Sequence, residues 1–245
     1  MAEYPIFEHD VLVIGAGGAG LRAAIEASKT GVSVGLVCKS LLGKAHTVMA
    51  EGGMAAAMGN VDDRDNWKVH FTDTMRGGQY VNNWRMAELH AKEAPDRVRE
   101  LEAWGAVFDR TKDGRILQRN FGGHKYPRLA HVGDRTGLEM IRTLQDHGIH
   151  QGLAIYQEYA IVQLLTSGKN VVGASDMIAR KAGSRSFTPG PLLSRPVAWV
   201  GSIRSRAIAG IVRVEAYRWL ITPVLNSLTW SLSSFILPGW SGPRA

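Results

Sequence analysis

The sequence has very little cysteine. Cys38 is the only cysteine among 245 residues. A single thiol excludes a disulfide-stapled scaffold and any zinc or iron–sulfur site that needs several cysteines, and it fits a reducing compartment. The first residues also lack a basic start followed by an apolar stretch, so we expect no signal peptide.

Acidic residues are scarce in the last part of the chain. The chain has 29 basic and 22 acidic residues. Residues 176–245 contain 9 of the basic residues and 2 of the acidic ones, so residues 1–175 contain 20 of each. The formal net charge of +7 therefore belongs to the tail. A basic patch that binds DNA or RNA normally belongs to the folded body, so we expect no nucleic-acid partner.

The same tail lacks a sustained helical or strand pattern. Its stretch from Trp219 to Pro243 has no charged residue and is long enough to span a bilayer. The serines and threonines in it, together with Asn226, Pro223 and Pro238, argue against a membrane anchor.

Residues 10–38 have the pattern of a βαβ unit. Two short apolar runs, DVLVI and SVGLVC, flank the segment GAGGAGLRAAIEASKTG. Gly15, Gly17 and Gly20 follow the first strand in the spacing GxGxxG and open the helix. In this context the glycines allow a tight turn, the approach of a pyrophosphate to the backbone, and close helix packing. We therefore predict a Rossmann-like α/β fold that binds a dinucleotide.

The second strand ends without the acidic residue that binds a ribose in NAD-dependent proteins. Cys38, Lys39 and Ser40 stand there instead. This departure weakens the case for NAD and leaves FAD or a variant site open.

Further elements follow from glycine, proline and periodicity. Residues 39–82 are rich in loops, and residues 82–105 predict two helices, with Pro95 in the first turn of the second and Gly105 as its stop. Residues 135–148 predict a helix ending at Gly148, and residues 153–174 a β-hairpin. The histidines show no metal-ligand spacing, and we expect His90 to be a surface or core residue.

Several blocks together resemble one family, the flavoprotein subunit of succinate dehydrogenase and fumarate reductase. They are VIGAGGAGLRAAIEA, CKSLLGKAHTVMAEGGMAAAMGN, HFTDTMRGG, the stretch from RMAELHAKEAP to DRTKDGRI, and QRNFGGHKYPRLAHVGDRTG. They occur in the family's order and cover about residues 8–175. The resemblance implies an FAD-dependent oxidoreductase of electron transport and the tricarboxylic acid cycle, which transfers hydride between succinate or fumarate and FAD.

The resemblance also implies a role for each matching position. Three glycines would hold the FAD pyrophosphate: Gly15, Gly17 and Gly20. The residues at the adenosine end would be Lys39, Ser40 and Ala160. The residues around the flavin ring would be His46, Thr47, Gly52 and Gly53. By resemblance, His46 is covalently bound to the flavin 8α carbon. Phe121 would approach the dicarboxylate. Glu51 stands where many members have glutamine, and its carboxylate would repel a dianionic substrate.

The family's catalytic residues lie further along the chain than the matching blocks. We therefore assign no catalytic residue and no metal ligand in this chain. By resemblance, the partners are an iron–sulfur subunit, membrane-anchor subunits and a dicarboxylate substrate. The expected location is cytoplasmic, peripheral to the inner face of the cell membrane.

The tail suggests a frame-shifted reading of the same gene. If the reading frame begins one base earlier, codons chosen for residues 230–244 can encode MEFVQFHPTGMVWPP, the family's substrate-site signature. Codons for residues 193–201 can likewise encode LATGGVGR, its second FAD-contacting strand. Such a shift would explain both the lost periodicity and the uneven charge.

We therefore expect two regions. Residues 1–175 would be the N-terminal part of an FAD-binding domain without its capping domain, and residues 176–245 an aberrant tail without a defined fold. An incomplete sheet leaves apolar surface uncovered, so we expect weak or absent FAD retention and a truncated chain that is inactive alone. The alternatives are a noncatalytic FAD-binding or membrane-associated fragment, or the inert product of a degraded gene.

Overall fold

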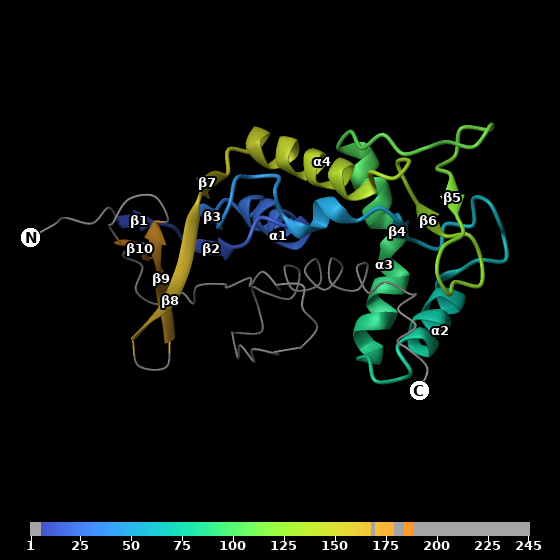
Figure 1. Cartoon of the computed structure of the whole chain (residues 1–245), viewed down its shortest axis with the longest axis horizontal. Helices are drawn as coiled ribbons and strands as arrows, with labels where there is room; N and C mark the ends of the chain where they lie inside the picture. Colours follow the sequence, from blue (N-terminus) through green and yellow to red (C-terminus); the bar gives the residue numbers. More distant parts are fainter. Residues whose placement is uncertain (1–5, 168–169, 179–183, 189–245) are drawn as a thin grey trace, which may run out of the picture. The chain divides into compact units, whose positions relative to one another are not determined.

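The chain forms two compact units. The computed structural model describes residues 6–167, 170–178 and 184–188. Within these described residues, unit 1 comprises residues 6–46 and those from 145 onward, and unit 2 comprises residues 47–144. Each sheet belongs to one unit, and its strands can be followed by their labels in Figure 1.

Unit 1 contains a parallel sheet in the order β2–β3–β7. Its strands are β2 (Val11–Ile14), β3 (Val34–Cys38) and β7 (Ala154–Gln157). Helix α1 (Gly18–Ser28) connects β2 to β3 and contacts both strands (Figure 1). All five residues of β3 are buried, as expected for the central strand of a covered parallel sheet. The predicted βαβ unit is confirmed.

Helix α1 can lie close to the sheet because its inner face is made of small residues. Ala23, Ala24 and Ala27 are all buried. The helix is capped at Lys29, and Gly31 follows with φ +80°, a left-handed conformation that glycine adopts without strain. The helix therefore ends just before Gly31.

A second sheet of unit 1 has the strand order β1–β10–β9–β8. Its strands are β1 (Ile6–Glu8), β8 (Tyr159–Ser167), β9 (Asn170–Ile178) and β10 (Ser184–Thr188). Strands β8 and β9 form the predicted antiparallel hairpin (Figure 1). The sheet continues past residue 175, because β9 runs on and β10 pairs in parallel with β1. The rest of the expected tail, residues 189–245, lies outside the described residues.

Apolar side chains join the two sheets of unit 1. Leu12, Val37 and Ala174 are buried together, with further side chains packed against them: Phe7, Ile14, Tyr156, Tyr159, Ile161 and Leu164. The cluster draws on strands that are far apart in the sequence. It therefore forms only when the β8–β9 hairpin docks beside the βαβ unit.

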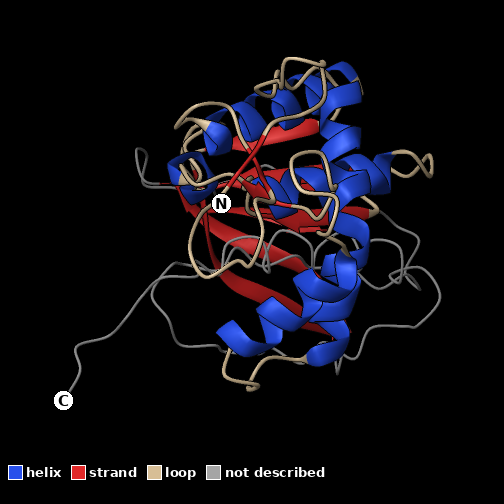
Figure 2. Cartoon of the chain, turned by 90° about the vertical axis from the view of Figure 1, so that its right-hand side faces the viewer, coloured by secondary structure: helices blue, strands red, loops and turns tan. Residues whose placement is uncertain are grey.

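Unit 2 combines short strands with long helices. Strands β4 (Met54–Ala55), β6 (Leu129–Ala130) and β5 (Gln118–Arg119) form a small antiparallel sheet in that order. Helices α2 (Trp67–Gly77) and α3 (Trp84–Ala103) pack together and are joined by a short turn (Figure 2). A 3₁₀ turn, η1 (His46–Met49), precedes them, and α4 (Thr136–His150) follows; His46 and residues 145–150 of these two elements are counted in unit 1. None of the helices in the described residues is both long enough and apolar enough to cross a membrane.

Helix α3 corrects one prediction. Residues 84–103 form one helix and not two, with Pro95 inside it. A proline there removes one backbone hydrogen bond, which normally costs about 3 kcal/mol. The helix continues because its buried face is held by packing, through Ala87, His90, Ala91, Ala94, Val98 and Leu101.

The end of α3 agrees with the sequence. Gly105 has φ +97°, and its N–H donates to the carbonyl of Glu102 at 2.9 Å. The N–H of Ala106 donates to the carbonyl of Leu101, also at 2.9 Å. This pair of bonds is a Schellman motif, so Gly105 is the predicted stop.

Helix α4 corrects a second prediction, because it runs past Gly148 to His150. A Cβ at Gly148 would lie 3.0 Å from Leu153 Cδ1, so close packing accounts for that glycine. The left-handed residue that follows the helix is Gly152, with φ +75°.

Candidate functional site

The glycine turn of unit 1 connects the end of β2 to the start of α1. The N–H of Gly15 donates to the Val37 carbonyl at 2.7 Å, and Gly15 has φ +112°. A Cβ at Gly20 would lie 1.7 Å from the Gly15 carbonyl oxygen, so any side chain there would force the turn apart. These two glycines are therefore required by the geometry of the turn itself.

Gly17 has a different role from its neighbours. It caps the N-terminus of α1 with φ −80° and ψ −178°, a conformation open to other residues. No side chain caps the helix and its first turn has no acidic residue. The positive end of the helix dipole at this N-terminus thus favours an anion. This cradle fits the diphosphate of a dinucleotide.

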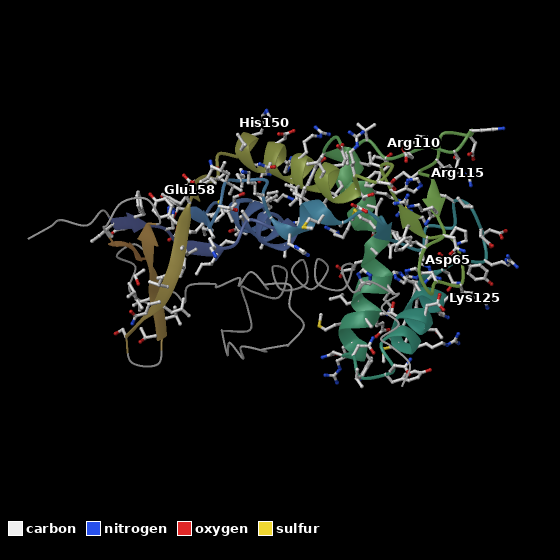
Figure 3. The ribbon with its side chains drawn as sticks, viewed as in Figure 1. Asp65, Arg110, Arg115, Lys125, His150 and Glu158 are labelled. Carbon is white, nitrogen blue, oxygen red and sulfur yellow. The ribbon has the colours of Figure 1, made fainter. Side chains whose placement is uncertain are left out.

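The end of β3 lies beside the junction of β7 and β8. Cys38 is opposite Gln157 in the parallel register, and the Ser40 carbonyl accepts from the N–H of Glu158 at 3.4 Å. Glu158 has φ +64° at this junction (Figure 3), and Ala160 follows two residues later in β8. The structure therefore brings Lys39 and Ser40, both exposed, near the start of β8.

Cys38 itself has no accessible thiol. Its side chain is buried, and Sγ lies 3.5 Å from the Tyr156 carbonyl oxygen. Burial raises the pKa of the Cys38 thiol to about 11, which keeps it protonated at neutral pH. The residue in the usual position of the ribose-binding acid is therefore structural.

The predicted flavin-ring residues are divided between the units. Exposed His46 is the last residue of its segment in unit 1, and Thr47 is the first of unit 2. In unit 2, a Cβ at Gly137 would lie 2.0 Å from the Thr47 carbonyl oxygen, and the Gly137 N–H donates to Ala50 at 2.8 Å. No local sequence pattern predicts this close packing at Gly137.

The loop at residues 51–53 is fastened to the small sheet of unit 2. Gly53 has φ +121°, and a Cβ there would lie 2.8 Å from the Ala130 carbonyl oxygen. Arg119 Nε donates to the Gly52 carbonyl at 2.8 Å, and the same guanidinium donates to the Glu51 carbonyl. No sequence pattern singles out Arg119, because only the fold places its side chain against this loop.

Phe121 and Glu51 lie in the same part of unit 2. A Cβ at Gly52 would lie 3.3 Å from Phe121 Cε1, so the ring packs over this glycine. The Phe121 side chain is 44% exposed, and Glu51 is exposed as well. The structure thus brings Phe121, Glu51, Gly52 and Gly53 together on one accessible surface.

A buried polar cluster lies elsewhere in unit 2. Arg128 is fully buried between two carboxylates, with Nη2 2.8 Å from Asp65 Oδ1 and 2.8 Å from Asp73 Oδ2. The ring of His70 lies 5.1 Å from that of His90 and 5.9 Å from that of His124, centroid to centroid. His90 is therefore a core residue. The described residues contain no group of three or more His, Cys, Asp or Glu that could hold a metal ion.

Burial controls the charge of this cluster. It lowers the pKa of His90 and of His124 to about 4, and that of His70 well below its ordinary value. Burial also raises the pKa of Asp65 to about 6, against the opposing effect of Arg128. The three histidines are neutral at pH 7, and His70 and His90 are core residues.

Comparison with known proteins places most of the chain in one group. A family model described as FAD binding domain matches residues 10–212. A protein of Methanothermobacter marburgensis, named as a subunit of fumarate reductase (CoM/CoB), is 44% identical over 196 residues, covering 77% of this chain and 36% of that protein. The succinate dehydrogenase flavoprotein subunit of Rickettsia felis is 37% identical over 172 residues, which cover 66% of this chain and 29% of that protein.

Solved structures agree. Mycobacterium smegmatis Sdh1 in complex with UQ1 is 57% identical with a TM-score of 0.73, covering 75% of this chain and 33% of that one. An E. coli quinol fumarate reductase FrdA variant is 30% identical with a TM-score of 0.72, and the match covers 80% of this chain and 32% of that one. The chain thus spans about a third of the length of the proteins it matches.

Proposed function

Because the chain belongs to the FAD-binding domain family, we propose that it is the FAD-binding part of a flavoprotein that interconverts succinate and fumarate. The single observation that carries the proposal is the glycine turn, where Gly20 has no room for a side chain and no side chain caps the N-terminus of α1. The relatives named as fumarate reductase and succinate dehydrogenase subunits support the dicarboxylate chemistry.

The proposed FAD site follows the turn and the edge of the parallel sheet. Gly15 and Gly20 shape the cradle, and Gly17 leaves room for the diphosphate against the α1 N-terminus. Lys39, Ser40 and Ala160 would contact the adenosine end, which their proximity to the β7–β8 junction supports.

The proposed flavin-ring site lies on the segment around η1 and the loop that follows it. Thr47, Gly52 and Gly53 would line the ring, and His46 would carry it covalently through the 8α carbon. The exposed imidazole of His46 is accessible for such a bond. Bound FAD would supply the acceptor or donor of the hydride.

The substrate-facing residues in this proposal are Phe121 and Glu51. Phe121 would contact the dicarboxylate, and the carboxylate of Glu51 would disfavour a dianion. Arg119 would position this surface, since it holds the backbone of residues 51 and 52. We assign no catalytic residue in this chain.

The proposed partners are membrane-anchor subunits together with an iron–sulfur subunit, at the inner face of the cell membrane. The relatives are named as subunits, which supports a place in a larger assembly. Co-purification of the tagged chain from its native cells tests this point. Recovery of the chain without any iron–sulfur protein would contradict it.

Flavin binding is tested by reconstitution. The purified full chain is mixed with FAD, unbound FAD is removed, and the flavin absorbance is measured. We expect bound flavin in the native chain and at least ten-fold weaker binding in Gly17→Ala, because its Cβ would occupy the approach to the backbone. Gly77→Ala is the control, since a Cβ there meets nothing within 4 Å.

Two outcomes would count against the proposal. A folded chain that stays colourless with FAD, or that binds another nucleotide at the glycine turn, would overturn the cofactor assignment. Flavin that binds and can be reduced by dithionite, but is never bleached by succinate in the complete assembly, would overturn the reaction.

A further inference from the structure

A hollow of about 480 Å³ opens on the surface of unit 2, whereas the glycine turn belongs to unit 1. The hollow lies between helix α2 and the loop around residue 124. The residues that line it are Lys68, Val69, Thr72, Asp73, Arg76, Gly123 and Lys125.

The polar side chains of the hollow are arranged by the helix period. Lys68, Thr72 and Arg76 are exposed and are spaced four residues apart, which places them in one stripe along α2. Lys125 comes from the loop beside α2, as Figure 3 shows. Three cations from two separate segments therefore surround one concave surface.

These cations have no carboxylate partner. Within the described residues, no ion pair joins Lys68, Arg76 or Lys125 to an acidic side chain, whereas most arginines of unit 2 pair with one. Examples of paired arginines are Arg64, Arg97, Arg99, Arg110, Arg115, Arg119 and Arg142. An unpaired cluster of like charges is unfavourable for the empty protein and favourable for a bound anion.

The single carboxylate of the hollow is already engaged. Asp73 Oδ2 lies 2.8 Å from Nη2 of Arg128 and accepts from the backbone N–H of Lys125 at 3.0 Å. Three cations and one carboxylate leave the lining with a net charge of +2. Behind Asp73, the buried charge of Arg128 is balanced by Asp65, whose Oδ1 lies 2.8 Å from Arg128 Nη2, so the net charge around the hollow remains +2.

We propose that this hollow binds a compact oxyanion with two or more negative groups, of the diphosphate or tricarboxylate type. Its volume lies within the usual range for small-ligand sites, about 300–1,000 Å³. The planar fork of Arg76 suits two oxygens of one phosphate or carboxylate group, and the two lysines supply mobile point charges for the other groups.

The experiment is a calorimetric titration of the full chain with sodium pyrophosphate and, separately, with sodium citrate. Both run at constant ionic strength adjusted with NaCl. FAD is present at saturation, because the glycine turn is a competing diphosphate site. The test variant is Arg76→Ala/Lys125→Ala, and the matched control is Arg85→Ala/Lys112→Ala. The control removes the same charge from exposed residues outside the hollow.

We expect saturable binding of at least one of the two anions, with affinity at least ten-fold lower in the test variant and within two-fold of native in the control. Tighter binding of pyrophosphate identifies a phosphate ligand, and tighter binding of citrate a carboxylate ligand. Equal losses in both variants, or heats reproduced by NaCl alone, would overturn the proposal. If the chain fails to bind FAD, the proposed function fails, and the comparison of the two variants still decides this site.

Discussion

Individual side chains hold the proposed flavin site in shape from a distance. Arg119 belongs to β5, yet its guanidinium bonds two carbonyls of the loop at residues 51–53 and lies 3.1 Å from Asp134 Oδ1. At Gly53 and Gly137, neighbouring backbone atoms occupy the space that a Cβ would need, so no larger residue fits there. These contacts hold the loop backbone on which the proposed site depends.

At the residue scale, His46→Ala tests the covalent bond. We expect the variant to bind FAD that is released on acid precipitation, because only the imidazole can form the bond, whereas native protein keeps its flavin. The measurement is flavin absorbance in the precipitate and the supernatant. His150→Ala is the control, since that exposed histidine lies at the end of α4. Acid-stable flavin in His46→Ala would contradict the proposal.

A second prediction concerns Glu51. In Glu51→Gln loaded with FAD, we expect succinate to bind about five-fold more tightly, since removing one exposed carboxylate near a dianion is worth about 1 kcal/mol. The backbone bond from Arg119 is unchanged by this substitution. Succinate titrations of the flavin spectrum measure the effect, with Glu88→Gln on α3 as the charge-matched control. Unchanged or weaker binding would remove Glu51 from the substrate surface.

At the scale of elements, caps and packing decide where each helix begins and ends. Asn66 caps α2, with Oδ1 accepting from the N–H groups of Lys68 at 3.0 Å and Val69 at 3.3 Å. Asn83 caps α3 in the same manner. Helix α3 then passes through Pro95 without ending, because its buried face is held by neighbours and outweighs the lost bond.

We expect Asn66→Ala to lower the free energy of unfolding by about 1 kcal/mol, the usual value of an N-cap. Urea denaturation followed by circular dichroism measures the change. Asn120→Ala, at an exposed position outside the helices, should change it by less than half as much. Equal effects of the two substitutions would mean that the cap bond contributes nothing.

At the scale of the whole molecule, the neutral histidine cluster makes stability depend on pH. The folded-state pKa values of His70, His90 and His124 lie below the unfolded value of about 6.5, so the unfolded chain binds more protons in acid. Their contribution is intact above pH 6.5 and is lost as the pH falls toward 4. Asp65 acts in the opposite direction below about pH 6, because its pKa is raised.

Since three histidines outweigh one carboxylate, we expect stability to fall between pH 7 and pH 5. A histidine with a folded-state pKa of about 4 costs about 2 kcal/mol at pH 5. Urea unfolding at both pH values measures this, and His90→Gln should show a smaller fall than native protein. Identical pH slopes for the two proteins would contradict the assignment.

The tail is tested at the level of the gene. We propose that residues 176–245 are read in a shifted frame, although the sheet includes β10 and the family model extends to residue 212. The nucleotide sequence around codon 175 is the measurement. We expect the frame one base earlier to remain open and to encode LATGGVGR, and stop codons in that frame would contradict the proposal.

The sequence by itself determined the βαβ unit, the glycine turn, the hairpin and the stop at Gly105. Each depends on local rules: short apolar runs make strands, and only glycine tolerates left-handed or crowded backbone. Tertiary structure alone decided that α3 passes through Pro95, that α4 continues to His150, and that Arg119 fastens the loop at residue 52. These outcomes depend on packing between segments far apart in the sequence, which no local pattern records.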